Sequence, residues 1–177
     1  MKIEQFIAQS EGQWRSMRSG HSIAFKQFEQ IVSNIKINLL APKDPIVMDL
    51  IQLSNKQNHM YLSPFQMRWE ADSDWLKDDI YQKNSGSTIL IPFPKTESQG
   101  FFLRSMGYTE PITSISDYSF LNDGTLVLTT KYKNTITEEK IWFISHSVRC
   151  RSSVIFTKEK AGILQTSFAS EIKSQIK

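Results

Sequence analysis

Arginine side chains occur at spacings that suit the binding of carboxylates. Arg18 lies three residues before His21, and Arg149 and Arg151 are two residues apart later in the chain. Residues two apart in an extended strand share a face, and the planar guanidinium fork fits a carboxylate. The pattern predicts an anion clamp at the mouth of a binding site. The alternative interpretation is a set of solvated strand ends with an incidental histidine.

A second group combines methionine and tryptophan with a charged segment. Trp75 follows Glu70 among further acidic residues, and alternate residues before it are apolar: Phe65, Met67, Trp69 and Ala71. Apolar residues on one strand face usually belong to a core, but the interior of a small barrel is also a ligand cavity. A tryptophan near a charged rim is typical of a platform on which a flat conjugated ligand stacks.

Other reactive groups carry no recognisable motif. Cys150 lies between Arg149 and Arg151 and faces the opposite side of a regular strand, which disfavours it as a nucleophile. The three histidines are far apart in the sequence, so no metal site is indicated: they are His21, His59 and His146. Any chemistry is therefore expected to come from a bound reactive ligand that the protein positions.

Three glutamates are the remaining candidate acid groups. Glu138, Glu139 and Glu171 are expected to be surface acids. One of them becomes a candidate proton donor or counter-ion if it faces a pocket.

These residues must be positioned by a mainly β structure. Residues 2–10 have the apolar spacing of a short amphipathic helix. Asp44-Pro45 is a helix start, although residues 44–58 could instead form a strand, and residues 163–172 fit a strand or a terminal helix. Short strands with local turns, among them Asn122-Asp123-Gly124, predict an antiparallel barrel. The expected strands are 13–18, 21–30, 31–40, 65–71, 86–93, 101–104, 115–120, 125–132, 140–146 and 151–156.

Gly12 and Trp14 predict how such a barrel is closed. Glycine lets the chain turn in tightly, and the indole covers the open end with a large apolar plate. A late arginine, either Arg149 or Arg151, is expected to pack across this indole as a cation–π contact.

The bulk properties predict one soluble, intracellular domain spanning residues 1–177. The chain has 177 residues, a net charge of +3 and one cysteine. The mild charge does not indicate nucleic acid, a single cysteine allows no internal disulfide, and neither a signal peptide nor a membrane-spanning run is apparent.

Seven segments, taken in their order and spacing, resemble the S-type phycobiliprotein lyases, the bilin lyases of lipocalin-like fold. Cys150 departs from this pattern, since relatives place an apolar residue between the two late arginines. The segments are GQWRSMRSGH with Phe25 after it, MRWE with Trp75, GSTILIP, LRSMGY, EEKIWF, VRCR and QTSFASEI.

The resemblance implies an all-β, antiparallel lipocalin-like (calycin) barrel that binds a phycobilin, with phycoerythrobilin favoured. The protein is expected to attach this bilin by a thioether bond to a cysteine of a phycobiliprotein apo-subunit of the phycoerythrin or phycocyanin type. The fold includes a short N-terminal helix and room for one further short helix. No metal, nucleic acid or membrane span is implied, and the location is cytoplasmic or the stroma of a plastid. Under this resemblance, the bilin-binding residues are Arg18, Met67, Trp69, Trp75, Arg149 and Arg151, and the candidate proton donors are His21 and Glu171.

Two other functions remain open from the sequence. One is a non-catalytic carrier of a bilin or fatty acid, which needs the same pocket. The other is a structural chaperone of phycobiliprotein subunits, which needs no pocket. Pairing through an outer sheet face into a homodimer is also compatible with the sequence.

Overall fold

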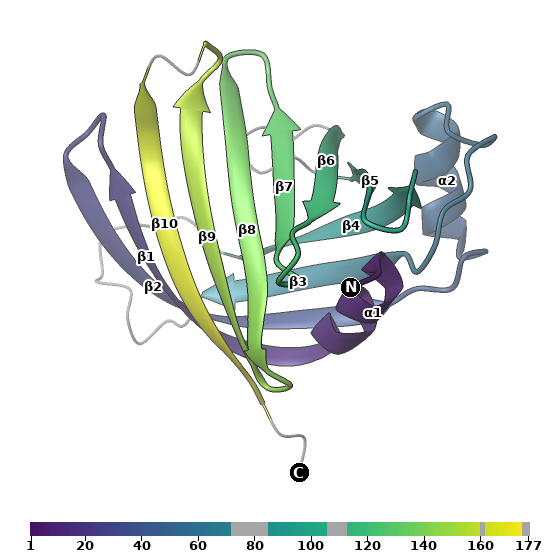
Figure 1. Cartoon of the computed structure of the whole chain (residues 1–177), viewed down its shortest axis with the longest axis horizontal. Helices are drawn as coiled ribbons and strands as arrows, with labels where there is room; N and C mark the ends of the chain where they lie inside the picture. Colours follow the sequence, from purple (N-terminus) through teal and green to yellow (C-terminus); the bar gives the residue numbers. More distant parts are fainter. Residues whose placement is uncertain (72–84, 106–112, 160–161, 175–177) are drawn as a thin grey trace.

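The computed structural model describes residues 1–71, 85–105, 113–159 and 162–174. Within these residues the chain forms a closed antiparallel barrel in which each strand pairs with the next and β10 pairs with β1 (Figure 1). The expected barrel is therefore confirmed. The strands are β1 (Gly12–Ser22), β2 (Gln27–Leu39), β3 (Phe65–Ala71), β4 (Ser85–Pro94), β5 (Gln99–Arg104), β6 (Ser114–Phe120), β7 (Leu126–Lys131), β8 (Thr135–Ser145), β9 (Val148–Thr157) and β10 (Ile163–Lys173).

The N-terminal helix α1 (Ile3–Ser10) packs into one end of the barrel. Ile3, Phe6 and Ile7 are buried and contact inward-facing residues such as Phe102 and Leu128. An isolated helix of this length is not stable in water, whereas burying each large apolar side chain contributes about 1.5–3 kcal/mol. The predicted helix over residues 2–10 is confirmed, and tertiary contacts hold it in place.

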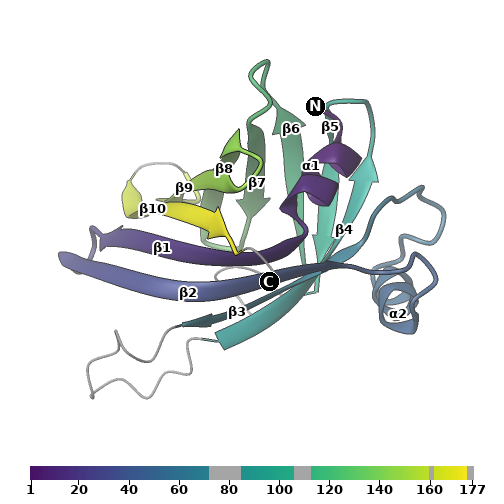
Figure 2. The ribbon, with the colours of Figure 1, turned by 90° about the horizontal axis from the view of Figure 1, so that it is seen from below.

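The second helix, α2 (Pro45–Leu53), covers the outer face of β4 and β5 (Figure 2). Asp44 caps it, because its Oδ1 accepts a hydrogen bond from the Ile46 N–H at 3.1 Å, and Pro45 occupies the first turn. The helical alternative for this segment is thus correct. The helix ends at Leu53 instead of near residue 58, and Asn55 just beyond it has a positive φ of 54°.

The first hairpin differs from the predicted one. No break occurs at Ser19-Gly20, because β1 continues to Ser22 and the turn occupies residues 23–26. Gly20 is an ordinary strand residue paired with Glu29. A Cβ on Gly20 would lie 3.1 Å from Glu29 Oε1, which is a close contact with the end of a flexible side chain.

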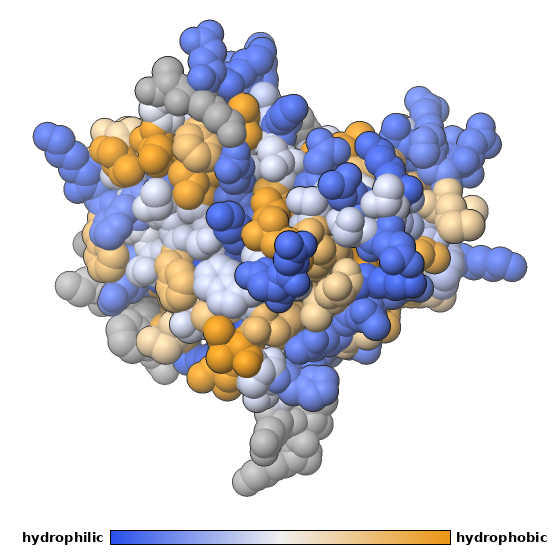
Figure 3. Space-filling model, viewed as in Figure 1, coloured by the Kyte–Doolittle hydropathy of each residue, from blue (hydrophilic) through white to orange (hydrophobic). Residues whose placement is uncertain are grey.

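The last segment is a strand that closes the barrel. β10 pairs with β9 on one side and with β1 on the other, so the terminal-helix alternative is wrong for residues 163–172. The outer face of β8–β10 shows apolar patches separated by polar side chains (Figure 3). Exposed apolar residues on this face include Ile144, Phe168 and Ile172.

Candidate functional site

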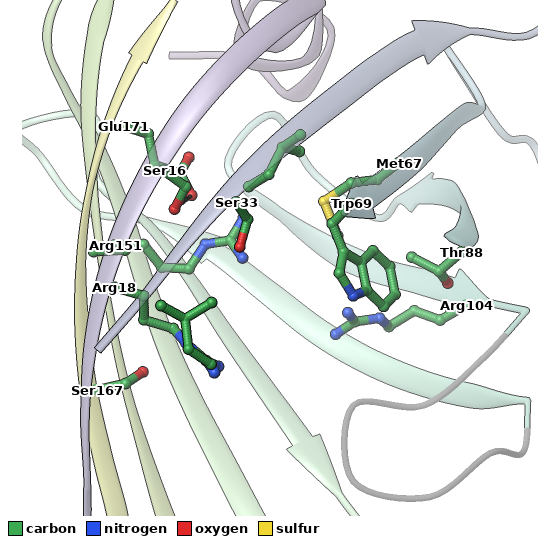
Figure 4. A pocket seen from close by; sticks show the side chains of 13 residues that line it. Ser16, Arg18, Ser33, Met67, Trp69, Thr88, Arg104, Arg151, Ser167 and Glu171 are labelled. Atoms are coloured by element: carbon green, nitrogen blue, oxygen red, sulfur yellow. Dashed lines mark hydrogen bonds between the residues drawn. The ribbon is translucent and has the colours of Figure 1, made fainter. Parts of the chain in front are cut away.

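A cavity of about 310 Å³ occupies the part of the barrel away from α1. Strand alternation builds it, because inward positions on β1, β3, β5, β9 and β10 recur every second residue. Figure 4 shows two facing walls, one from β1, β9 and β10 and the other from β3, β4 and β5. The charged and large side chains that line it are Arg18, Met67, Trp69, Arg104, Arg151 and Glu171.

Trp14 closes the barrel below this cavity. Its indole is 1% exposed, and Nε1 donates a hydrogen bond to the Ser10 carbonyl oxygen of α1 at 2.8 Å. The Arg149 guanidinium carbon lies 4.5 Å from the ring centroid, so the predicted cation–π contact is confirmed with Arg149 as the partner. Gly12 has a φ of +122°, which L side chains rarely adopt, and this turns the chain from α1 into β1.

Glu171 links the floor of the barrel to the cavity. One carboxylate oxygen accepts a hydrogen bond from Arg149 Nε, and the other accepts one from Ser16 Oγ at 3.3 Å. Burial by itself raises the pKa of Glu171, but the charges of Arg151 and Arg149 and these hydrogen bonds outweigh it, so the pKa lies below its ordinary value of 4.5. Glu171 is therefore an ionised group at neutral pH.

A second buried ion pair crosses the barrel between strands that are not neighbours. Arg104 Nη1 on β5 lies 3.5 Å from Glu139 Oε2 on β8, and both side chains are almost fully buried. Arg104 and Arg151 line both the 310 Å³ cavity and a hollow of about 50 Å³ nearer to α1. The two hollows therefore share these two arginines as lining residues.

Comparisons with known proteins decide the family. The family described as "CpeS-like protein" matches residues 2–174. "Chromophore lyase CpcS/CpeS 3" of Trichodesmium erythraeum is 42% identical over 98% of this chain and 100% of its own length. The S-type phycobiliprotein lyase CPES from Guillardia theta has a solved structure that is 34% identical and superposes with a TM-score of 0.83, covering 100% of this chain and 95% of its own.

The chain belongs to the CpeS-like family. It is accordingly an S-type phycobiliprotein lyase, an enzyme of the class that the resemblance predicted. "Putative phycoerythrobilin lyase CpeS" of Microchaete diplosiphon is a further relative, 41% identical over 85% of this chain and 66% of its own length.

Among the residues that the sequence proposed for this CpeS-like site, five meet in the cavity. They are Arg18, Met67, Trp69, Arg151 and Glu171. Arg149 points inward as well, but it is 2% exposed and lies at the floor between Trp14 and Glu171. Its contacts with Trp14 and Glu171 hold these two side chains in place.

One further sequence candidate, His21, lies away from the cavity. His21 is exposed on the outer face of β1, because it is three residues from the inward-facing Arg18, and its ring centroid lies 4.7 Å from that of Phe28. The structure does not bring it into the cavity. Trp75 lies outside the described residues. Cys150 pairs with Trp142 and Ser170 at outward positions, as the alternation predicted.

The sequence reasoning missed Arg104 and Glu139 as interior residues of this CpeS-like barrel. Glu139 and Glu171 were expected at the surface, yet they are 2% and 1% exposed. The signal for Glu139 was its alternation with the buried Thr137 and Ile141 on one strand. Over the described residues, no cluster of His, Cys, Asp and Glu is arranged to hold a metal ion, and no helix is long and apolar enough to span a membrane.

Gly86 sets the position of Trp69. The two residues are paired across β3 and β4, and a Cβ on Gly86 would lie 2.5 Å from Trp69 Cζ2. We expect Gly86→Ala to push the indole into the cavity and to weaken ligand binding several-fold, about 1 kcal/mol. Tryptophan fluorescence and an absorbance titration measure both effects. Gly162→Ala is the control, because a Cβ there would meet nothing within 4 Å; equal effects of the two substitutions would contradict the assignment.

Glu171 should make the stability of the barrel depend on acidic pH. Its pKa is lowered in the folded state, so its contribution is complete above the ordinary value of 4.5 and is lost as pH falls through the folded pKa. The difference in the free energy of unfolding between the wild type and Glu171→Gln should therefore be largest near neutral pH and shrink below about pH 4.5. Urea unfolding at a series of pH values measures it, and a constant difference down to pH 3 would refute the prediction.

Proposed function

We propose that this protein binds a linear tetrapyrrole in the barrel cavity and attaches it by a thioether bond to a cysteine of a phycobiliprotein subunit. The observation that carries the proposal is the pairing of Arg18 and Arg151 on one wall with Trp69 on the facing wall (Figure 4). A bilin is a long conjugated ligand with two propionates, so it needs cations for the carboxylates and a flat surface for the pyrrole rings.

The size of the cavity is also compatible with delivery of such a ligand to an acceptor protein. Its volume of about 310 Å³ lies at the lower end of the range for small-molecule sites. A long tetrapyrrole would therefore keep one end outside the cavity, where an acceptor protein can reach it. The proposal assigns Glu171, an ionised carboxylate that lines the cavity, to accept hydrogen bonds from pyrrole N–H groups and so to favour a protonated bilin.

The proposed reaction adds a thiol of the partner across the exocyclic double bond of the bilin. The sulfur bonds to the ethylidene carbon, the thiol proton is balanced by protonation of the ring carbon, and no group leaves. The nucleophile thus belongs to the partner, which agrees with the outward position of Cys150. This protein contributes orientation and exclusion of water.

The proposal favours phycoerythrobilin as the bilin. The support is the name of the Microchaete relative at 41% identity, which is a putative phycoerythrobilin lyase. A direct comparison of phycoerythrobilin with phycocyanobilin tests this preference, since both carry the same two propionates and differ in conjugation.

The decisive experiment combines binding with transfer. Purified protein is titrated with each bilin by absorbance, and the complex is then mixed with apo-phycobiliprotein subunits. A covalent adduct on the subunit, seen as zinc-induced fluorescence on a denaturing gel, should form faster and with fewer products than with free bilin. Binding without improved transfer would leave only a carrier. Binding of the subunit without any change in the bilin spectrum would indicate a structural chaperone.

A further inference from the structure

We propose that Glu29 competes with the ligand for Arg18. The Glu29 carboxylate pairs with Arg18 while the site is empty, and a carboxylate of the ligand displaces it. This inference rests on the proposed function, because it concerns how the same cavity takes up and releases an acidic ligand. In this view Glu29 tunes affinity at the mouth of the cavity, and Arg18 is the arginine that exchanges partners.

Glu29 is ion-paired with an arginine that lines the cavity. Arg18 Nη2 lies 2.9 Å from Glu29 Oε1, and Arg18 lines the cavity together with its strand partner Ile31. Glu29 is two residues closer to the open end of β2 than Ile31 and shares its inward face. Gly20, the strand partner of Glu29, leaves the room in which the carboxylate reaches across to Arg18.

The Arg18–Glu29 pair is more exposed than two other ion pairs inside the described part of the barrel. The Arg18 and Glu29 side chains are 29% and 48% exposed, whereas those of Arg104 and Glu139 are 5% and 3% exposed. The pair of Arg149 and Glu171 is buried as deeply, at 2% and 1%. Solvent-exposed ion pairs contribute little free energy, and removal of one member leaves the other hydrated. Buried pairs lose far more when one partner is removed.

The three pairs therefore differ in whether a ligand can open them. A propionate that enters the mouth can replace Glu29 on Arg18 at little cost in free energy. One carboxylate takes the place of another, and the released Glu29 side chain is hydrated by water. The same exchange at the buried pairs would leave an uncompensated carboxylate in the interior. Competition from Glu29 lowers the affinity of the site for the ligand. A lower affinity helps a ligand that must leave again for an acceptor protein.

The test compares a bilin that has carboxylates with one that has none. Phycoerythrobilin and its dimethyl ester are titrated by absorbance into the wild type and into Glu29→Gln. We expect the free acid to bind the variant about two- to fivefold more tightly, the range set by exposed ion pairs, and the ester to bind both proteins equally. Glu97→Gln is the matched control, because it breaks an ion pair of the same 2.9 Å length with Lys2, a residue that borders α1 instead of the cavity.

The outcomes are distinct. Weaker or unchanged binding of the free acid to Glu29→Gln would overturn the proposal, as would an equal gain for the ester. In an Arg18→Ala background, Glu29→Gln should produce no further gain, and a persisting gain would also overturn it. A wild type that binds neither form of the bilin would overturn the proposed function itself. Binding by the wild type with no response to Glu29→Gln would overturn only this inference.

Discussion

Arg149→Ala is expected to lower the free energy of unfolding by about 3–5 kcal/mol, the usual effect of removing one member of a buried ion pair. Glu171 would remain as a buried carboxylate with its Ser16 hydrogen bond but without its Arg149 partner. The substitution also removes the cation that lies 4.5 Å from the Trp14 ring centroid, and it leaves a void beside an indole that is 1% exposed.

Thermal and urea unfolding measure this prediction. For a domain of this length, each kcal/mol corresponds to roughly 2–4 °C in Tm. Arg18→Ala is the control, because its ion pair is partly exposed and should contribute no more than about 1 kcal/mol. The double variant Arg149→Met with Glu171→Leu should recover part of the loss, since no buried charge is left alone. A loss below about 1 kcal/mol in Arg149→Ala would show that the pair does not stabilise the floor.

Local sequence signals predicted most of the barrel. The alternation from Phe65 to Ala71, the Asp44-Pro45 helix start and the Asn122-Asp123-Gly124 turn each correspond to an element of the structure. These signals work because strand faces, caps and tight turns depend on neighbours in sequence. Gly20 misled the prediction, because it lies inside a regular strand, where it pairs with Glu29, and not in a turn.

The interior of the site was only partly predictable. The inward positions of Arg18, Met67 and Trp69 follow from alternation alone. The bridge between Arg104 and Glu139 does not, because it joins β5 and β8 across the barrel, and no local pattern specifies which distant strands face each other. The role of Arg149 likewise depends on its distance from Trp14, which is far from it in sequence.

The burial of the interior ion pairs decreases from the floor of the barrel to its mouth. The deepest pair, Arg149 and Glu171, is tied to the Trp14 closure, and the most exposed pair, Arg18 and Glu29, lies at the open end. Structural and ligand-binding arginines can therefore be separated by burial, although all of them lie on inward faces of the same barrel. Variants at the floor should change stability first, and variants at the mouth should change binding first.

Trp69→Ala should have the largest effect on ligand binding of the described cavity residues. The indole lies against Gly86 on the wall opposite Arg18 and Arg151 (Figure 4), so it offers a flat surface to a conjugated ligand held by those cations. Loss of one aromatic stacking platform weakens the binding of planar rings by about 1–3 kcal/mol, or roughly 5- to 150-fold. Trp69 is partly buried and packs against the buried cluster of Trp14, Ile35 and Ile37, so the barrel should stay folded but lose some stability.

Absorbance titration with phycoerythrobilin, alongside circular dichroism, separates the loss of binding from a loss of folding. Trp142→Ala is the matched control, since Trp142 lies on the outer face of β8, with its ring centroid 6.1 Å from that of Phe168. It removes an indole without touching the cavity, so it should leave the titration unchanged. If Trp69→Ala and Arg18→Ala both bound the bilin as tightly as the wild type, the ligand would have to occupy another part of the molecule. If Trp142→Ala weakened binding as much as Trp69→Ala, the effect would reflect a general disturbance of the barrel.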